Sequence, residues 1–308
     1  MTKNNNIEVK ESVARGKLEF EDCYSLYKFI EAISLLVDEV PLTVDSDNNK
    51  LVIKFMDAPR VCLIETIFSN PKQIISTSSL KSFLKSDKKS TDIISKYHYN
   101  IDIEKSGKQT ININDLKNIL KVKKNDEKNV NIIFEDPYKI LVEKESTSLG
   151  VIKKNLLYLF TEIEDISIET LNNTEYPSTI EVSQKLLNDF FYEAGVYSEV
   201  IGIEINKKGI HFTEEGVIGD SDIFYESKLL NVHNISTKIE QGYYSLTYLN
   251  LVKPIVNIME ETDTIKIELK TDHPLRVSIK FDKIGAEITY YLACRVVEVE
   301  FNDDKDEF

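Results

Sequence analysis

The chain has 308 residues, which suits two medium-sized domains, and its 42% hydrophobic content is enough for a sizeable core. No apolar run reaches the ~20 residues of a membrane helix, and the first residues are too polar for a signal peptide, so we expect a soluble, intracellular protein with no membrane partner. The net charge of −14 argues against non-specific binding to nucleic acid, although it is compatible with a locally basic surface.

Four amphipathic segments, separated by short alternating runs typical of strands, predict four helices. The first covers residues 22–38, and the second begins at the capping candidate Asn114. The third follows Ser183, and the fourth follows Ser245 and is disturbed by Pro254. The apolar faces consist, in chain order, of Cys23, Leu26, Tyr27, Ile30, Ile33 and Val37; of Leu116, Ile119 and Leu120; of Leu186, Leu187, Phe190, Phe191 and Ala194; and of Leu246, Leu249 and Val252.

Strand-like runs follow the helices, for example at residues 51–55, 60–67 and 129–134. This succession predicts one βαβββ unit that repeats four times. Residues 69–97 are rich in Ser and Lys and indicate an exposed insertion in the first unit. Residues 162–178 are acidic and polar, which is typical of an extended connector between two domains.

The sequence has no phosphate-binding loop, dinucleotide fingerprint, nucleophile elbow or zinc motif. Its cysteines, Cys23, Cys62 and Cys294, lie among apolar neighbours, which favours buried thiols over a disulfide or metal site. The four histidines lack ligand spacing. The Asp-Ser-Asp triplets at 45–47 and 220–222 favour turns over a cation site. We therefore expect neither an enzyme nor a cofactor or metal.

Several segments in order carry a resemblance to a known family. The run KFMDAPRVCLIE at 54–65 resembles a strand pair in which a Met-Asp turn precedes a Val-x-Leu strand. The runs at 207–227 and 245–254 resemble a hairpin and a last helix, and residues 268–298 resemble a C-terminal region with a Tyr-Tyr-Leu-Ala signature. Spanning about residues 16–300, these segments are similar to the archaeal and eukaryotic DNA sliding clamps of the proliferating cell nuclear antigen family.

The resemblance implies an α+β, two-domain DNA clamp fold, in which helices line a central hole, sheets lie outside, and three subunits close into a ring. The expected divisions are an N-terminal extension at 1–16, a first clamp domain at 17–161, the connector at 162–178, a second clamp domain at 179–300 and an acidic tail at 301–308. The implied function is that of a DNA polymerase sliding clamp, a processivity factor. A hetero-ring or checkpoint-type clamp subunit and an unrelated β-rich enzyme or viral scaffold are the alternatives.

Lysines on the helices are the candidates for sequence-independent contact with DNA phosphates. Lys117, Lys121 and Lys124 are spaced to share the face of the second helix opposite its apolar residues. The resemblance adds Lys28, Lys185 and Lys253 on the other helices. An ordinary solvated face is the alternative, and the weak positive charge of the four helices leaves room for partner subunits in a hetero-ring.

The resemblance also implies a pocket for clamp-interaction peptides of DNA polymerase, the clamp loader, flap endonuclease and DNA ligase. Its candidate residues are Met56, Val61 and Leu63 in the first domain, Leu171 in the connector, and Pro274, Tyr291, Leu292 and Ala293 near the C-terminus. An apolar groove with a Met and a Tyr suits such peptides, whereas any single residue could belong to the core. Asn172, Asn173 and Cys294 depart from the family pattern, so client preference is expected to differ.

Ring closure in the family joins two edge strands of neighbouring subunits. The matching segments are 152–160 and 222–227, which alternate apolar and polar residues and carry complementary charges. The interface candidates are Lys154, Leu157, Leu159, Asp222, Phe224 and Glu226. Alternatively, residues 152–160 form an internal strand. A clamp of this family would work in the cytoplasm or nucleoid if archaeal and in the nucleus if eukaryotic.

Overall fold

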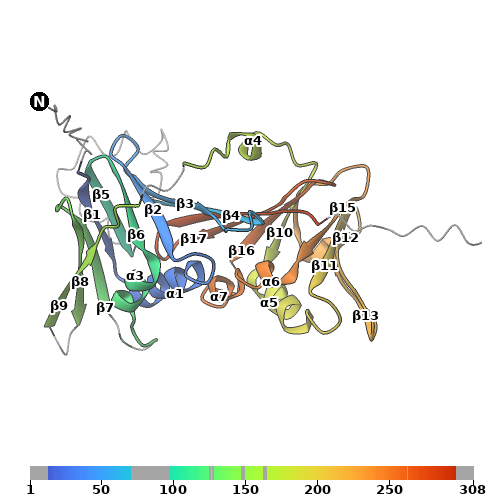
Figure 1. Ribbon diagram of the computed structural model, residues 1–308. Helices are drawn as coiled ribbons and strands as arrows, with labels where there is room; N and C mark the ends of the chain where they lie inside the picture. The colour runs from blue at the N-terminus through green and yellow to red at the C-terminus, as the bar shows by residue number, and fades with distance from the viewer. Residues whose placement is uncertain are drawn as a thin grey trace, which may run out of the picture. The chain divides into compact units, whose positions relative to one another are not determined.

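The structure, a computed structural model, describes residues 13–70, 98–124, 126, 128–146, 150–161, 165–261 and 263–295 (Figure 1). The chain divides into two compact units, Met1–Ser167 with Ile279–Thr289 and Ile168–Ser278 with Tyr290–Phe308. Both consist mainly of antiparallel strands with few helices, which is compatible with the expected clamp fold. The predicted insertion at 69–97 lies outside the described residues from residue 71 onward, as does the predicted tail at 301–308.

The first unit contains most of the N-terminal half of the chain. Its elements are β1 (Arg15–Phe20), α1 (Cys23–Ile33), β2 (Glu39–Asp45), β3 (Lys50–Met56), β4 (Cys62–Ser69), β5 (Tyr99–Lys105), β6 (Gly107–Asn112), α3 (Ile113–Leu120), β7 (Lys128–Phe134), β8 (Lys139–Ser146) and β9 (Gly150–Leu157). Five strands form a sheet in the order β5-β1-β7-β8-β9. In a second ladder, β3 pairs with β2 and β4, and β2 pairs with β6.

The core of the first unit lies where its two helices pack on the strands. α1 and α3 lie side by side (Figure 1). Phe29 of α1 is fully buried, and its ring meets that of Phe68 of β4 edge-on, with 5.5 Å between centroids. Leu116 and Leu120 are buried on α3, as the apolar pattern predicted. Burial of these faces is what holds helices as short as these in place.

α1 is shorter than the predicted helix over 22–38. It ends at Ile33, because the Ser34 hydroxyl donates to Glu31 O at 2.8 Å and the following amides bond to carbonyls three residues back. Such bonds tighten the last turn and stop the helix. The predicted cap of α3 was wrong by two residues, since it is the side chain of Asn112 that accepts a hydrogen bond from the Asp115 amide.

The second unit contains the connector and most of the C-terminal half. Its elements are α4 (Glu169–Asn172), β10 (Ser178–Ser183), α5 (Gln184–Glu193), β11 (Val200–Asn206), β12 (Gly209–Gly216), β13 (Gly219–Glu226), η2 (Ser227–Leu229), β14 (Asn231–Asn234), β15 (Glu240–Ser245), α6 (Leu246–Leu249), α7 (Lys253–Val256) and β16 (Thr264–Leu269). Residues of both units occur in β17 (Leu275–Phe281) and β18 (Ala286–Leu292). Four strands form a sheet in the order β13-β12-β11-β15, and β10 pairs with β14 and β16.

The helices of the second unit follow the predicted caps. Ser183 Oγ accepts a hydrogen bond from the Leu186 amide at 3.3 Å and begins α5. The predicted fourth helix is two short helices, α6 and α7. The interruption falls just before Pro254, as predicted, and Pro254 lies in the first turn of α7, where no backbone N–H is needed. Phe190 of α5 stacks on Phe212 of β12 with 4.3 Å between centroids, which anchors the helix to the sheet.

The two Asp-Ser-Asp triplets differ in structure. Asp45 accepts hydrogen bonds from the Asp47 and Asn48 amides at 3.1 Å each, which confirms a turn. The second triplet was predicted as a turn but lies within strand β13, where Asp222 contacts His211. The described residues hold no group of three or more His, Cys, Asp or Glu side chains that could bind a metal ion.

Candidate functional site

Lys117 and Lys253 stabilise the C-terminal ends of neighbouring helices. Lys117 Nζ donates to the Oγ of Ser34, the C-cap of α1, at 3.0 Å and to Asn114 Oδ1 at 2.6 Å. Lys253 Nζ donates to Phe191 O, in the last turn of α5, at 3.3 Å. A cation is favourable there because the helix dipole leaves negative partial charge at this end. Both lysines therefore have a structural role that their spacing did not reveal.

Lys28 is also engaged within the chain. Its Nζ lies 2.5 Å from Glu31 Oε2 and 5.4 Å from the centroid of the Tyr27 ring. Although partial burial raises the pKa of Glu31, hydrogen bonds from Lys28 and Tyr27 lower it below its ordinary value. The carboxylate of Glu31 thus largely neutralises the positive charge of Lys28 before any ligand binds.

The prediction that Lys117, Lys121 and Lys124 share one helix face was wrong. α3 ends at Leu120, and Lys121 already has a non-helical backbone, with φ −43° and ψ 125°. Lys121 and Lys124 therefore lie in the loop after the helix, and both are exposed. Lys185, in the first turn of α5, is exposed as well. Among the described residues, the side chains of these three lysines have no hydrogen bond or ion pair, so they remain available to an anion.

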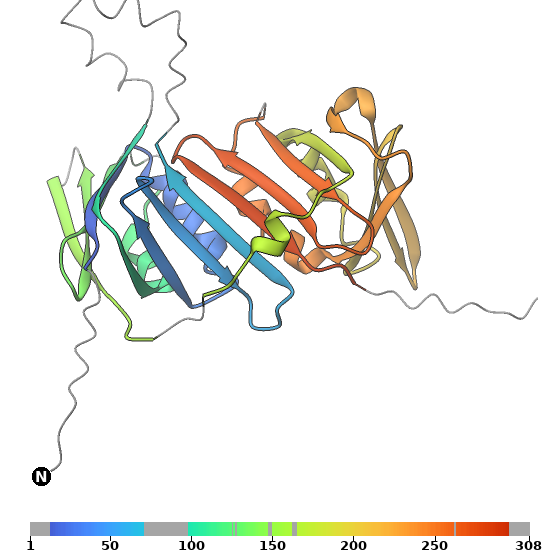
Figure 2. The same ribbon diagram turned by 90° about the horizontal axis from the view of Figure 1, so that it is seen from above.

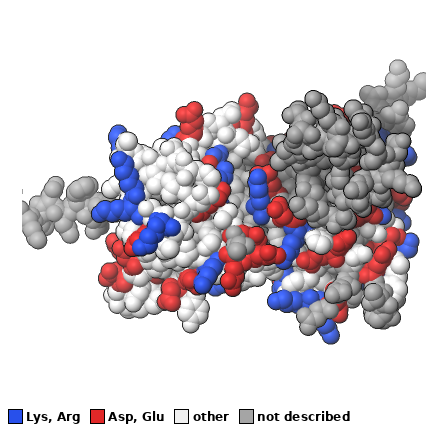
Figure 3. All heavy atoms as spheres, turned by 180° about the vertical axis from the view of Figure 1, so that it is seen from behind, with Lys and Arg blue, Asp and Glu red and all other residues white. Residues whose placement is uncertain are grey.

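Charges of both signs are mixed on the surface. Figure 3 shows Lys and Arg side chains interspersed with Asp and Glu over the described part of one face. Exposed pairs of this kind contribute little to stability and are screened by salt. The described part of this face is therefore not a broad basic surface.

The pocket candidates of the first unit surround the turn between β3 and β4. Met56 ends β3 and is half-buried, Val61 lies in the turn and is half-buried, and Leu63 is buried in β4. The turn is held by the buried carboxylate of Asp57, which accepts hydrogen bonds from the amides of Val61 at 2.8 Å and Cys62 at 2.7 Å. Met56 and Val61 can present apolar surface, whereas Leu63 belongs to the core.

In the second unit, Tyr291 is fastened to the connector. Its hydroxyl donates to Asn172 Oδ1 at 2.6 Å, and α4 lies beside this end of β18 (Figure 2). Tyr291 and Leu292 are each 3% exposed, whereas Leu171 and Ala293 are half-buried. The prediction of an open apolar wall at Tyr291 and Leu292 therefore differs from the structure, in which their side chains are covered.

A polar cluster that sequence reasoning missed lies next to these residues. Arg276 binds the buried carboxylate of Glu268 through two hydrogen bonds of 2.6 Å, and its guanidinium lies 4.4 Å from the centroid of the Tyr176 ring. Burial raises the pKa of Tyr176 to about 12, so its hydroxyl stays protonated and donates to Pro274 O at 2.8 Å. The signal available in the sequence was an acidic residue at position 268 between the apolar residues Ile267 and Leu269.

β9 is the last strand of its sheet, so one of its edges lacks a partner strand among the described residues. Leu157 is 66% exposed, and Lys154 is exposed as well. Lys153 is paired at 2.5 Å with a glutamate of β8. The predicted edge is confirmed for β9 but was wrong for Leu159, which lies beyond the strand and whose amide donates to Thr110 O at 2.8 Å.

β13 is likewise the outer strand of its sheet in the described part of the chain, which confirms the second predicted edge. Phe224 is 38% exposed and stacks on His211 with 4.2 Å between ring centroids. Asp222 Oδ1 lies 3.2 Å from Nδ1 of the same histidine, and Glu226 is paired with Lys228 at 2.5 Å. Both carboxylates predicted for the interface thus already have partners in their own chain.

No described helix combines the length and the apolar character required to cross a membrane.

Comparison with known proteins found several similar chains. The DNA polymerase sliding clamp of Methanothermobacter thermautotrophicus is 25% identical over 191 residues, covering 61% of this chain and 72% of that protein. The DNA polymerase sliding clamp of Methanobrevibacter smithii is 22% identical over 284 residues, covering 91% of this chain and 98% of that protein. Proliferating cell nuclear antigen 1 of Plasmodium falciparum is 24% identical over 267 residues, covering 81% and 82%. No protein-family model matches the chain.

Proposed function

We propose that this chain, which is related to the sliding clamps of the proliferating cell nuclear antigen family, is a DNA polymerase sliding clamp. The observation that carries the proposal is the similarity to sliding clamps along nearly the whole chain, which includes both units. In this role the protein is a non-enzymatic platform that tethers replication proteins to duplex DNA. It would work wherever the DNA of the cell lies, in the nucleoid or in the nucleus.

The element order supports a clamp built from four βαβββ units with helices facing DNA. One strand precedes each of α1, α3, α5 and the α6–α7 pair, and three or more strands follow each of them. In such a ring, lysines contact phosphates without reading bases, which leaves the clamp free to slide. Because Lys28, Lys117 and Lys253 have intrachain partners, we assign the main contacts to Lys121, Lys124 and Lys185.

The test of DNA contact is polymerase processivity with the variant Lys121→Glu, Lys124→Glu, Lys185→Glu. Each lost phosphate contact should weaken binding and flatten its dependence on salt. We expect reduced clamp-dependent processivity at moderate salt and an unchanged circular dichroism spectrum. The matched control replaces by Glu the lysines Lys105 of β5, Lys270 after β16 and Lys280 of β17, which lie neither on a helix nor directly next to one. Equal processivity of the two folded variants would contradict the assignment.

Ring closure would join β9 of one subunit to β13 of the next in an antiparallel pair. Both strands are edges, with exposure that alternates along β13 and extends over six of the eight residues of β9. An unpaired edge presents amides and carbonyls that need partners. Leu157 and Phe224 supply apolar surface for the contact. With Lys153, Asp222 and Glu226 paired within the chain, backbone hydrogen bonds and apolar contact rather than rim charges would drive this head-to-tail association.

Assembly is tested by light scattering on a size-exclusion column. We expect a trimer of about 106 kDa, three times the chain mass of 35.4 kDa, and a shift toward monomer on Leu157→Lys or Phe224→Lys. Tyr138→Lys is the matched control, because Tyr138 is 64% exposed, much like Leu157, but lies off the edge strand. A wild-type monomer at micromolar concentration would contradict the homotrimer and favour a hetero-ring subunit.

Client peptides of DNA polymerase, the clamp loader, flap endonuclease and DNA ligase would use the candidate residues that remain accessible. Met56→Ala with Val61→Ala should abolish binding of a clamp-interaction peptide in calorimetric titration, since both half-buried side chains present apolar contact surface. Tyr291→Phe keeps the covered ring and removes the hydroxyl that donates to Asn172, which tests the fastening of the connector separately. Unaltered affinity in the double variant would remove the pocket from the proposal.

A further inference from the structure

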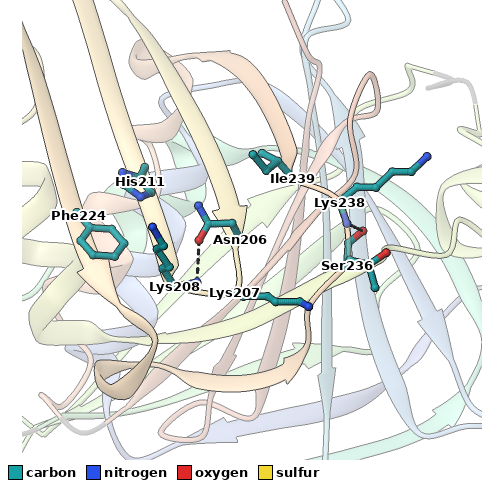
Figure 4. Close-up of a pocket in the computed structure, with 9 residues that line it drawn as sticks. Asn206, Lys207, Lys208, His211, Phe224, Ser236, Lys238 and Ile239 are labelled. Atoms are coloured by element: carbon teal, nitrogen blue, oxygen red, sulfur yellow. Dashed lines mark hydrogen bonds between the residues drawn. The ribbon is translucent and has the colours of Figure 1, made fainter.

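A basic pocket of about 500 Å³ opens on the second unit (Figure 4). It lies between the β11–β12 turn, the exposed side of β12 and β13, and the segment before β15. Lys207, Lys208 and Lys238 carry its charge, and Phe224 and Ile239 supply apolar surface. The remaining lining residues are Asn206, His211, Ser236 and Thr237, so no carboxylate lines the pocket.

The three lysines of this pocket have no ion pair among the described residues, although the chain as a whole carries a net charge of −14. Three carboxylates beside the lining have other hydrogen-bond or ring contacts: Asp222 contacts His211, Glu204 accepts from Asn206 at 2.6 Å, and Glu240 accepts from the amide and hydroxyl of Thr271, both at 2.9 Å. Burial raises the pKa of Glu240, but these bonds lower it by more, and Lys238 adds to their effect without forming an ion pair with Glu240. Three unpaired ammonium groups around one hollow favour an anionic ligand with several charges. The exposed Ile239 and Phe224 favour a ligand that also has an apolar part.

The chain itself passes close to this pocket at Arg295. The Arg295 amide donates to Tyr243 O of β15 at 2.7 Å. Ile239 of the pocket precedes Tyr243 by only four residues, or about 13 Å along a strand. The next outward amide of this edge, that of Gln241, donates to Thr271 Oγ1 at 3.2 Å. Arg295, the last described residue of the chain, is thus held close to the segment that carries Ile239.

We propose that residues 296–308 dock in this pocket and act as an intramolecular acidic ligand. The segment, VVEVEFNDDKDEF, has six carboxylates against one lysine, with Phe301 and Phe308 on either side of the most acidic stretch. Fully extended, 13 residues reach about 40 Å, well beyond the distance to the pocket. The carboxylates pair with Lys207, Lys208 and Lys238, and a phenylalanine covers Ile239, which leaves Phe224 to the proposed subunit contact.

Attachment to the same chain makes this docking effective. Exposed ion pairs are individually weak, but covalent attachment through a short tether raises the local concentration of the segment to about the millimolar range. The bound segment hides the pocket from other polyanions, including nucleic acid, and screens three cations beside strand β13. The sequence supplies an acidic segment, and the backbone hydrogen bond of Arg295 places the start of that segment within reach of the basic pocket.

The experiment uses the full chain with Phe301→Trp, which adds the sole tryptophan because the natural sequence has none. We expect this tryptophan to be protected from acrylamide quenching and to lose the protection at high salt. Lys207→Glu with Lys208→Glu and Lys238→Glu should abolish the protection. Adding Asp303→Lys, Asp304→Lys and Asp306→Lys to that variant should restore it, since the charges are then exchanged. Lys105→Glu with Lys270→Glu and Lys280→Glu, which changes net charge equally outside the pocket, should leave the protection intact.

Two results would overturn the proposal. One is equal quenching in the parent and in the pocket variant, which would show that the segment does not use these lysines. The other concerns the affinity of a labelled single-stranded oligonucleotide for the pocket. If that affinity is the same in the parent and in the variant with Asp303, Asp304 and Asp306 changed to Asn, the pocket belongs to an external polyanion. Because segment and pocket belong to one chain, the protection should persist in the Leu157→Lys background. The test is therefore independent of ring formation.

Discussion

The helix pairs of the two units are joined at their ends in the same way but with different chemistry. In the first unit, Cys23 at the start of α1 donates through Sγ to Leu120 O at the end of α3, at 3.6 Å. In the second, Gln184 at the start of α5 donates through Nε2 to Val256 O at the end of α7, at 2.9 Å. A lysine of the later helix closes the opposite end in both units. The difference shows that a recurring architecture constrains the position of a donor rather than its residue type.

The two units also differ in the burial of their ion pairs. In the first unit, the side chains of Lys28 and Glu31 are 29% and 31% exposed. In the second unit, the side chains of Arg276 and Glu268 are only 16% and 7% exposed. A half-exposed pair is screened by water, whereas removing one partner of a buried pair leaves an uncompensated charge. Polar substitutions should therefore cost more in the second unit than in the first.

The largest effect is expected from Glu268→Ala. It should lower the free energy of unfolding by roughly 3–5 kcal/mol, because Arg276 is left charged and buried without its partner. Glu31→Ala, the matched change in the first unit, should cost less than about 1 kcal/mol. Urea denaturation followed by circular dichroism measures both. Similar losses in the two variants would contradict the contrast in burial.

Stability at acid pH should also depend on the ion pair between Glu268 and Arg276. Burial raises the pKa of Glu268, but the hydrogen bonds and the charge of Arg276 lower it by more. The net pKa therefore lies below that of an ordinary glutamate. A depressed carboxyl pKa contributes stability that is complete above the unfolded value of about 4.3 and is lost as pH falls through the folded value. Glu268→Gln should therefore flatten the dependence of stability on pH below about 4.3. Parallel wild-type and variant curves from denaturation at several pH values would show that the pair does not titrate as expected.

Exchanging the helix-end donors should have an intermediate effect. Gln184→Leu keeps the side-chain size but removes the shorter of the two hydrogen bonds to Val256 O, which retains only the Met259 amide at 3.2 Å, so we expect a loss of about 1.5 kcal/mol. Cys23→Ala removes a small side chain and a weak thiol donor, so we expect a smaller loss, on the order of 1 kcal/mol. Thermal unfolding of both variants, with hydrogen exchange of each helix pair, provides the measurement. A larger loss for Cys23→Ala would reverse the ranking of the two donors.

The smallest effects are expected for the helix-closing lysines. Lys117→Met and Lys253→Met retain most of the aliphatic chain and remove the charge at the helix end, a change of about 0.3–1 kcal/mol each. Lys185→Met, at the start of a helix, is the control and should not destabilise the chain for the same reason. If Lys185→Met proves as costly as the other two, the dipole argument for Lys117 and Lys253 fails.

Local patterns in the sequence determined much of the fold. Alternation and helical spacing located the strands around residues 51–67 and 129–134 and the helices after Ser183 and Ser245, because these periods reflect which side of one element is buried. The resemblance to sliding clamps, together with alternation, indicated the segments of β9 and β13 as edge strands. Resemblance to sliding clamps, carried by separate segments along the chain, agrees with the relatives found by comparison.

Only the tertiary structure decided what individual side chains do. Periodicity placed Lys117 with Lys121 and Lys124, but the lysine bonds to Ser34, which is 83 residues away in sequence. The sequence predicted that Tyr291 forms part of a pocket wall, whereas its hydroxyl donates to Asn172, 119 residues earlier. Spacing along one element records burial, whereas a hydrogen-bond partner depends on which distant segments the fold brings together. That long-range packing is the information a local pattern does not contain.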